Sequence, residues 1–221
     1  MEFDFSPLAD SWQYLAGGLG VTLALSCLTV LGSLALGTLT GLARCYGPVW
    51  LRPALVFYID CMRAIPVLVV LVWMYFAFPL LTGITLPPFW AAFVALTLHI
   101  AAYVAEIVRA GIGSVREGQM RAALAIGMSR FQAVAQIILP QAVIRMLPAL
   151  GSIVSITIKD TAIAAVIAVP EYMKRSETVA GQSYHPIEVF TVAALVYFVI
   201  LFPVTRAIDL LYGRVAQLGR S

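Results

Sequence analysis

Long apolar stretches recur along the chain, and each is long enough to cross a membrane as a helix. A hydrocarbon core about 30 Å thick requires about 20 apolar residues in helical conformation. Five stretches meet this length, at residues 14–43, 53–81, 89–108, 142–169 and 187–211. Several exceed the minimum, so we expect tilt or extension beyond the bilayer. The pattern predicts an all-α, polytopic membrane protein whose residues 1–221 form one transmembrane domain.

The composition supports a membrane environment. The chain is 62% hydrophobic and 11% charged, whereas soluble domains carry about 25% charged residues. Residues 1–10 contain three acidic residues and no Lys or Arg, so we expect no signal peptide, which would begin with a basic region. Cys27, Cys45 and Cys61 lie in or beside apolar runs without metal-site or disulfide spacing. They are interpreted as small apolar side chains, and no metal site is expected.

The distribution of basic residues predicts the orientation. Lys and Arg mark the cytoplasmic segments of membrane proteins. Basic residues gather after the first, third and fifth apolar stretches: Arg44 and Arg52; Arg109, Arg116, Arg121, Arg130 and Arg145; Arg206, Arg214 and Arg220. The opposite segments are the acidic N-terminus, the uncharged residues 82–88, and a loop in which Lys174 and Arg175 are offset by Glu171 and Glu177. We expect the N-terminus outside and the C-terminus in the cytoplasm.

Small residues and prolines predict helix contacts and breaks. Ser33, Gly37 and Gly41 recur at intervals of four in the first stretch, a spacing that lets two helix backbones approach closely. We therefore expect this stretch to pack tightly against another helix. Prolines are expected to bend or end helices, and they occur at Pro66, Pro140, Pro148 and Pro170.

The segment from residue 103 to residue 150 leaves the third apolar stretch and is expected to re-enter the membrane near Pro140. Its pattern predicts two short helices joined by a turn at Gly127, with Ser129 as the N-cap of the second. Apolar residues follow at intervals of three and four: Phe131, Val134, Ala135 and Ile138. Such a segment must bury its apolar surface, either against its own helices or against a partner.

Four blocks of sequence resemble the permeases of ABC importers. The run RAALAIGMSRFQAVAQIILPQA, residues 121–142, is similar to their EAA motif, with Arg121 in place of the usual Glu. The positions that match the motif are Ala122, Ala123, Gly127, Ile137, Leu139 and Pro140. The other blocks are MRAIPVLVVLVWMYF, AYVAEIVRAGIGSV and IKDTAIAAVIAVPEY. Together they resemble the permeases of polar amino acid importers of the histidine, glutamine, glutamate and arginine type.

This resemblance implies a type I importer permease fold of five helices and a coupling segment, about residues 114–139, that docks on a separate ATPase. The residues given this role are Arg121, Ala122, Ala123, Gly127, Met128, Ser129 and Arg130. It also implies a second permease, two ATP-binding subunits and a substrate-binding protein. Arg121 favours a non-identical second permease with a more typical motif. Since the chain has no GxxxxGK[ST] phosphate loop, we expect no cofactor here and place ATP and Mg²⁺ on the ATPase.

Ionisable residues at bilayer depth cost about 3 kcal/mol or more and therefore suggest function. The candidate substrate-binding residues are Arg63, His99, Glu106, Lys159, Asp160 and Thr161. The ammonium of an amino acid needs an anion, Asp160 or Glu106, and its carboxylate needs donors such as Arg63, His99 or Lys159. Structural alternatives remain: Asp60 pairing with Arg63, Lys159 with Asp160, and His99 as an ordinary core residue.

These features predict a multi-pass permease of the bacterial inner (plasma) membrane that imports a polar amino acid without any covalent chemistry of its own. Residues 62–76 look closer to importers of acidic amino acids, so a glutamate- or aspartate-like substrate is favoured. The alternatives are a basic or amide amino acid importer of the same family and a stand-alone secondary transporter. A membrane enzyme is disfavoured because the chain has no HExxH or GxSxG motif. A structural scaffold would leave the intramembrane charges without a purpose.

Overall fold

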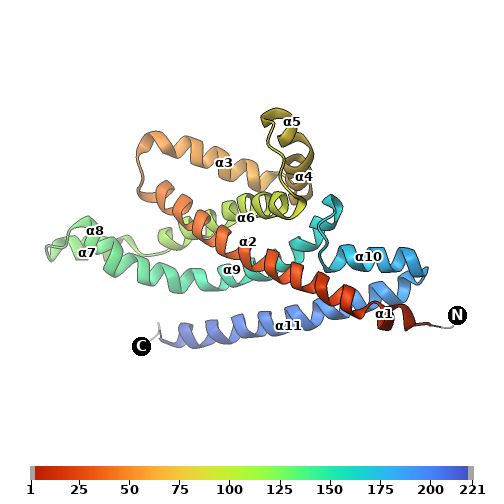
Figure 1. Ribbon diagram of the computed structural model, residues 1–221. Helices are drawn as coiled ribbons and strands as arrows, with labels where there is room; N and C mark the ends of the chain where they lie inside the picture. The colour runs from red at the N-terminus through yellow and green to blue at the C-terminus, as the bar shows by residue number, and fades with distance from the viewer. Residues whose placement is uncertain (1–2, 219–221) are drawn as a thin grey trace.

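The computed structural model describes residues 3–218, without the side chains of Leu211 and residues 214–218, and its regular structure is helical throughout (Figure 1). Arg220, used above for the orientation, lies outside the described residues. The helices are α1 (Ser6–Asp10), α2 (Trp12–Tyr46), η1 (Val49–Leu51), α3 (Arg52–Ala64), α4 (Val67–Val72), η2 (Trp73–Ala77), α5 (Phe78–Thr82), α6 (Pro88–Gly113), α7 (Glu117–Ala125), α8 (Arg130–Ala133), η3 (Val134–Ile138), α9 (Leu139–Asp160), η4 (Thr161–Ile167), α10 (Tyr172–Ser183) and α11 (Pro186–Leu218).

Four unbroken helical stretches are long and apolar enough to cross a membrane, namely α2, α6, Arg130–Ile167 and Pro186–Leu210. The predicted spans at 14–43, 89–108 and 187–211 are confirmed. The predicted fourth span at 142–169 lies largely within one helical stretch that already begins at Arg130 and ends at Ile167. A π-helical turn, η3, lies just before Pro140. In a π turn the backbone N–H groups bond to carbonyls five residues earlier instead of four. This shift accommodates Pro140, which has no N–H to donate to the preceding turn.

The predicted span over residues 53–81 is not one continuous helix. It consists of Val49–Ala64 and Val67–Thr82, bent by 107°. The bend lies at Ile65 and Pro66, which both have extended backbone (ψ of 131° and 138°). Proline disfavours helical conformation in the preceding residue and lacks the N–H that would continue the helix. Counted as one broken span, this pair brings the total to five.

Helix α6 lies at the centre of the molecule and packs against α2, α3, α4 and α9. Six of its alanines are fully buried: Ala91, Ala92, Ala95, Ala101, Ala102 and Ala105. The small residues of α2 face this surface. A Cβ atom on Gly37 would lie 2.5 Å from Cβ of Val104 and 2.6 Å from the carbonyl oxygen of Ala101. The predicted close packing of the first span is therefore confirmed, with α6 as the partner.

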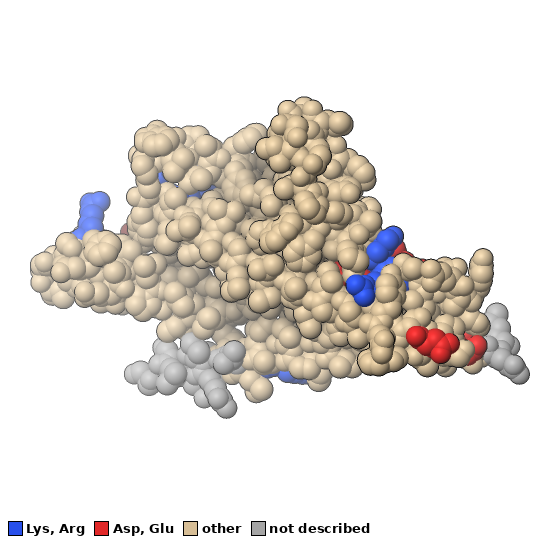
Figure 2. All heavy atoms as spheres, viewed as in Figure 1, with Lys and Arg blue, Asp and Glu red and all other residues tan. Residues whose placement is uncertain are grey.

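The long helices run roughly along one axis, and α3, α4 and α5 lie along one side of it (Figure 1). Helices α7 and α8 occupy the same end as the last turns of α11, whereas α1 and α10 lie at the opposite end. Figure 2 shows a face that is almost uncharged across its middle, with charged side chains mainly near the two ends. This distribution fits an axis that crosses the membrane. A second, smaller core at the α10 end contains Leu15, Tyr172, Val179 and Val189.

Candidate functional site

The turn between α7 and α8 has the predicted geometry. Gly127 has a φ of +89°, in the left-handed region that glycine adopts at little cost. Ser129 caps α8: its Oγ accepts from the Gln132 amide at 3.3 Å, and the Gln132 side chain accepts from the Ser129 amide at 2.8 Å. This reciprocal pair is a capping box. The first short helix, the turn and the N-cap are confirmed, whereas the second predicted short helix is the beginning of the longer helical stretch Arg130–Ile167.

The coupling segment divides its apolar residues between the protein and its surroundings. Ala123, Ala133 and Ile138 are buried, with at most 5% of each exposed. Ile126 and Phe131, which flank the turn, are 79% and 81% exposed. We refer to Ile126 and Phe131 as the apolar tip. The sequence left open whether the apolar residues of this segment pack against the protein's own helices or against a partner. Ala123, Ala133 and Ile138 are buried within the protein, whereas the apolar tip is uncovered.

The other residues assigned to coupling lie close to this tip in the sequence. Arg121 forms an i,i+4 ion pair with Glu117 at 3.5 Å, and both side chains are largely exposed, so the pair contributes little to stability. Ala122, Ser129 and Arg130 are also exposed, and Met128 is half-buried. The turn therefore presents an apolar centre with a basic rim.

Glu106 is held by two arginines near one end of the bundle. Its Oε2 atom lies 2.7 Å from Nη1 of Arg44, and its Oε1 atom lies 2.5 Å from Nη2 of Arg109. Such charge-assisted bonds are roughly twice as strong as neutral ones. Because Arg44 belongs to α2 and Arg109 to α6, the carboxylate joins the ends of the two most closely packed helices. Both of its oxygens already have a cationic partner.

Arg63 and His99 each lie near the ring of Tyr103. The Arg63 guanidinium, on α3, lies 5.8 Å from the centre of the Tyr103 ring. The ring of His99 lies 5.3 Å from the ring of Tyr103, and both residues belong to α6. Among the described residues, the ion pairs do not include one between Arg63 and Asp60. His99 is 6% exposed, and its Nδ1 atom has no hydrogen-bond partner within that same part of the chain.

Lys159, Asp160 and Thr161 lie together where α9 passes into η4. Thr161 is fully buried and donates to the Ile158 carbonyl at 2.8 Å. Lys159 is exposed and Asp160 is half-buried. Helix α4 packs against both α6, which carries His99, and η4, which begins at Thr161. Glu106 belongs to neither group, since it is engaged with Arg44 and Arg109.

A buried carboxylate that the sequence interpretation treated as a loop charge is Glu171. It is fully buried and accepts hydrogen bonds from the Thr22 hydroxyl at 3.2 Å, the Tyr197 hydroxyl at 3.1 Å and the Lys174 amide at 2.6 Å. Burial raises the pKa of Glu171 above its usual value, against the opposing effect of these bonds. No local pattern marks this site, because Thr22 lies 149 residues and Tyr197 26 residues away in sequence.

Several curated proteins of known name are similar to this chain over most of its length. The glutamine transport system permease protein GlnP of Escherichia coli (strain K12) is 36% identical over 203 residues, which cover 90% of this chain and 92% of that protein. The glutamate/aspartate import permease protein GltK of Escherichia coli O6:H1 is 34% identical over an alignment of 225 positions, gaps included, that covers 97% of this chain and 99% of that protein. The arginine transport system permease protein ArtQ of Bacillus subtilis (strain 168) is 33% identical over 208 residues, or 93% and 94%.

A solved structure and a family description agree with these similarities. The crystal structure of an amino acid ABC transporter with histidines superimposes with a TM-score of 0.90 at 31% identity, covering 97% of this chain and 100% of that one. The family described as "Binding-protein-dependent transport system inner membrane component" matches residues 13–217. The helices, the turn at Gly127 and this match lead to one conclusion: the chain belongs to the family of inner membrane components of binding-protein-dependent transport systems.

Proposed function

We propose that this chain is the permease subunit of an ATP-driven importer of amino acids. Its relatives are named as permeases for glutamine, arginine and glutamate/aspartate. The observation that carries the proposal is the apolar tip at Ile126 and Phe131, since large apolar side chains exposed at a tight turn outside the membrane need a partner. The chain itself performs no covalent chemistry.

The partner of the apolar tip is a separate ATPase subunit. Buried aromatic side chains contribute strongly to interfaces, and charged residues at the rim add orientation rather than affinity. Phe131 and Ile126 would enter a groove on the ATPase, and Arg121 and Arg130 would lie at its edge. ATP and Mg²⁺ would bind the ATPase. Gly127 would permit the sharp turn, and the capping box at Ser129 would keep it rigid.

The proposed substrate is an acidic amino acid, glutamate- or aspartate-like. Such a molecule carries two carboxylates and one ammonium. Within the described part of the chain, Arg63 and Lys159 take part in no ion pair, so two cations remain for the carboxylates. Asp160, half-buried beside Lys159, is suited to the ammonium. His99 and Thr161 would add hydrogen bonds, and Glu106 would act through Arg44 and Arg109 rather than by direct contact.

The complete importer would contain a second, non-identical permease, two ATPase subunits and a substrate-binding protein outside. The proposed orientation places α7, α8 and the end of α11 in the cytoplasm and α1 and α10 outside. Five crossings would put the two termini on opposite sides of the membrane. The basic rim of the turn then lies on the cytoplasmic side, in accord with the positive-inside rule.

The test is amino acid-stimulated ATP hydrolysis by the reconstituted complex. Glutamate and aspartate, each with the binding protein, should stimulate hydrolysis, whereas glutamine and arginine should not. Arg63→Gln should reduce the response to glutamate, and Arg52→Gln, an exposed change on the same helix, should not. Stimulation by glutamine or arginine alone would contradict the acidic substrate, and no stimulation by any amino acid would contradict the proposed class.

A further inference from the structure

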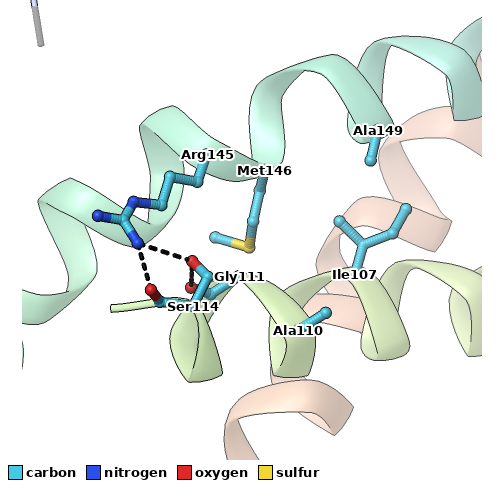
Figure 3. A pocket seen from close by; sticks show the side chains of 7 residues that line it. All are labelled: Ile107, Ala110, Gly111, Ser114, Arg145, Met146 and Ala149. Atoms are coloured by element: carbon cyan, nitrogen blue, oxygen red, sulfur yellow. Dashed lines mark hydrogen bonds between the residues drawn. The ribbon is translucent and has the colours of Figure 1, made fainter. Parts of the chain in front are cut away.

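The base of the cytoplasmic segment is closed by a side chain that the coupling motif does not include. Helix α6 ends at Gly113, and α9 begins at Leu139. Between them the chain leaves the bundle, forms the turn and returns. Arg145, on the second turn of α9, donates from Nη1 to the carbonyl oxygen of Ser114 and, at 3.3 Å, to its Oγ atom (Figure 3). The two residues lie 31 positions apart.

The acceptors of Arg145 are groups that helix geometry leaves available. The last carbonyls of a helix have no partner within the helix, and they form the negative end of its dipole. Ser114 Oγ donates onward to the Gly111 carbonyl at 2.6 Å, so the guanidinium also stabilises a carbonyl of the final turn of α6. A cation in this position is favoured both by hydrogen bonding and by the dipole.

The two helices also touch directly at this level. Gly111 faces Met146, and a Cβ atom on Gly111 would overlap the Met146 side chain. A cleft of about 280 Å³ lies between the helices here; Arg145, Ser114, Gly111 and Met146 line it together with Ile107, Ala110 and Ala149 (Figure 3). The contacts that join the two helices therefore form part of the wall of an open cleft.

We propose that Arg145 is a positioning residue for coupling: with Ser114, Gly111 and Met146 it forms a clamp that joins α6 to α9. This role rests on the proposed function of the chain as an ATP-driven permease. A loop pinned only by its covalent ends would absorb a displacement of the apolar tip by bending. Closed at its base, the segment transmits that displacement to α6 and α9 as one body, and the adjoining cleft leaves room for the helices to move.

The experiment measures the number of amino acid molecules imported per ATP hydrolysed, using the complete complex in proteoliposomes. Arg145→Gln should lower this ratio about tenfold, because transport falls more than hydrolysis does. Arg145→Lys, which keeps the positive charge and one nitrogen that can donate to both Ser114 oxygens, should restore most of the ratio. Arg52→Gln serves as the control for loss of an exposed arginine and should leave the ratio unchanged. A ratio that stays at the wild-type value in Arg145→Gln, or an equal fall in transport and hydrolysis, would overturn the clamp.

A second variant covers the case in which Arg145→Gln does not assemble. Ser114→Ala removes the Oγ acceptor and the relay to Gly111 but leaves the backbone carbonyl. Loss of one such hydrogen bond is expected to lower the ratio about two- to tenfold, and an unchanged ratio would overturn the clamp. If the wild-type complex responded to no amino acid, the proposed function itself would fail and the clamp with it. A working wild type with unaffected variants would overturn the clamp alone.

Discussion

Replacing Gly37 by alanine tests the close contact between α2 and α6. The added Cβ would lie 2.5 Å from Cβ of Val104 and 2.6 Å from the Ala101 carbonyl oxygen, whereas carbon atoms in contact lie about 3.5–4.0 Å apart. The helices must therefore separate by about 1 Å, because a backbone carbonyl cannot rotate away. Overpacking of this kind costs about 1–3 kcal/mol, and the obstructing backbone places Gly37→Ala in the upper part of that range.

The matched control is Gly20→Ala in the same helix, where an added Cβ meets no atom within 4 Å. Both changes gain about 1 kcal/mol of helix propensity, so their difference isolates the contact at about 2–3 kcal/mol. For a protein of this size each kcal/mol shifts the Tm by about 2–4 °C. Thermal unfolding in detergent should place Gly37→Ala about 4–12 °C below Gly20→Ala. Equal Tm values for the two variants would refute the close packing.

Three further predictions concern polar groups. Burial raises the pKa of Glu171 above its unfolded value of about 4.5. The stability that Glu171 contributes is therefore fully present below pH 4.5 and is lost as the pH rises through the raised pKa. Glu171→Gln should flatten the dependence of Tm on pH in this range, and an unchanged slope would contradict a raised pKa for Glu171. Glu106→Gln should lower the free energy of unfolding by about 1–3 kcal/mol, a value between those typical of exposed and of buried ion pairs. The control is Glu117→Gln, which should leave the Tm unchanged because the ion pair of Glu117 is exposed. Ser129→Ala should lower the stability of α8 by about 1 kcal/mol, seen as faster hydrogen exchange at the Gln132 amide; equal exchange would exclude the cap.

Local signals in the sequence were sufficient for several features. The length of the apolar stretches predicted the spans, the four-residue spacing of small residues predicted the contact of α2, and the Gly127 turn with its Ser129 cap was predicted within a few residues. Each depends on neighbours in the same helix or turn. The structure confirms all three for this reason.

Proline positions show where local signals are ambiguous. Pro66 ends a helix and coincides with the 107° bend, whereas Pro148 lies inside α9 and Pro140 near its start. The same residue type thus gives different outcomes, since packing of the neighbouring helices decides whether the chain continues. The sequence offered no signal for the π-helical turn before Pro140, which makes Arg130–Ile167 one continuous helical stretch.

Contacts between distant residues were beyond prediction from one sequence. Glu106 shares a helix face with Arg109, but its bond to Arg44 joins residues 62 positions apart. Glu171 reads as a surface charge in a polar loop until α2 and α11 close over it. The contact between Arg145 and Ser114 likewise depends on how α9 returns to the bundle. In each case the partner is chosen by helix packing rather than by nearby sequence.

The central claim is that transport through this chain depends on an ATPase docked at the apolar tip. The most direct measurement is uptake of labelled glutamate into proteoliposomes that contain the two permeases and the binding protein, with or without the ATPase and ATP. Uptake should require both, and Phe131→Ala should abolish most of it, since loss of a buried Phe contact costs about 2–3 kcal/mol of docking. Undiminished uptake in the absence of the ATPase, or in Phe131→Ala with the ATPase present, would contradict the claim.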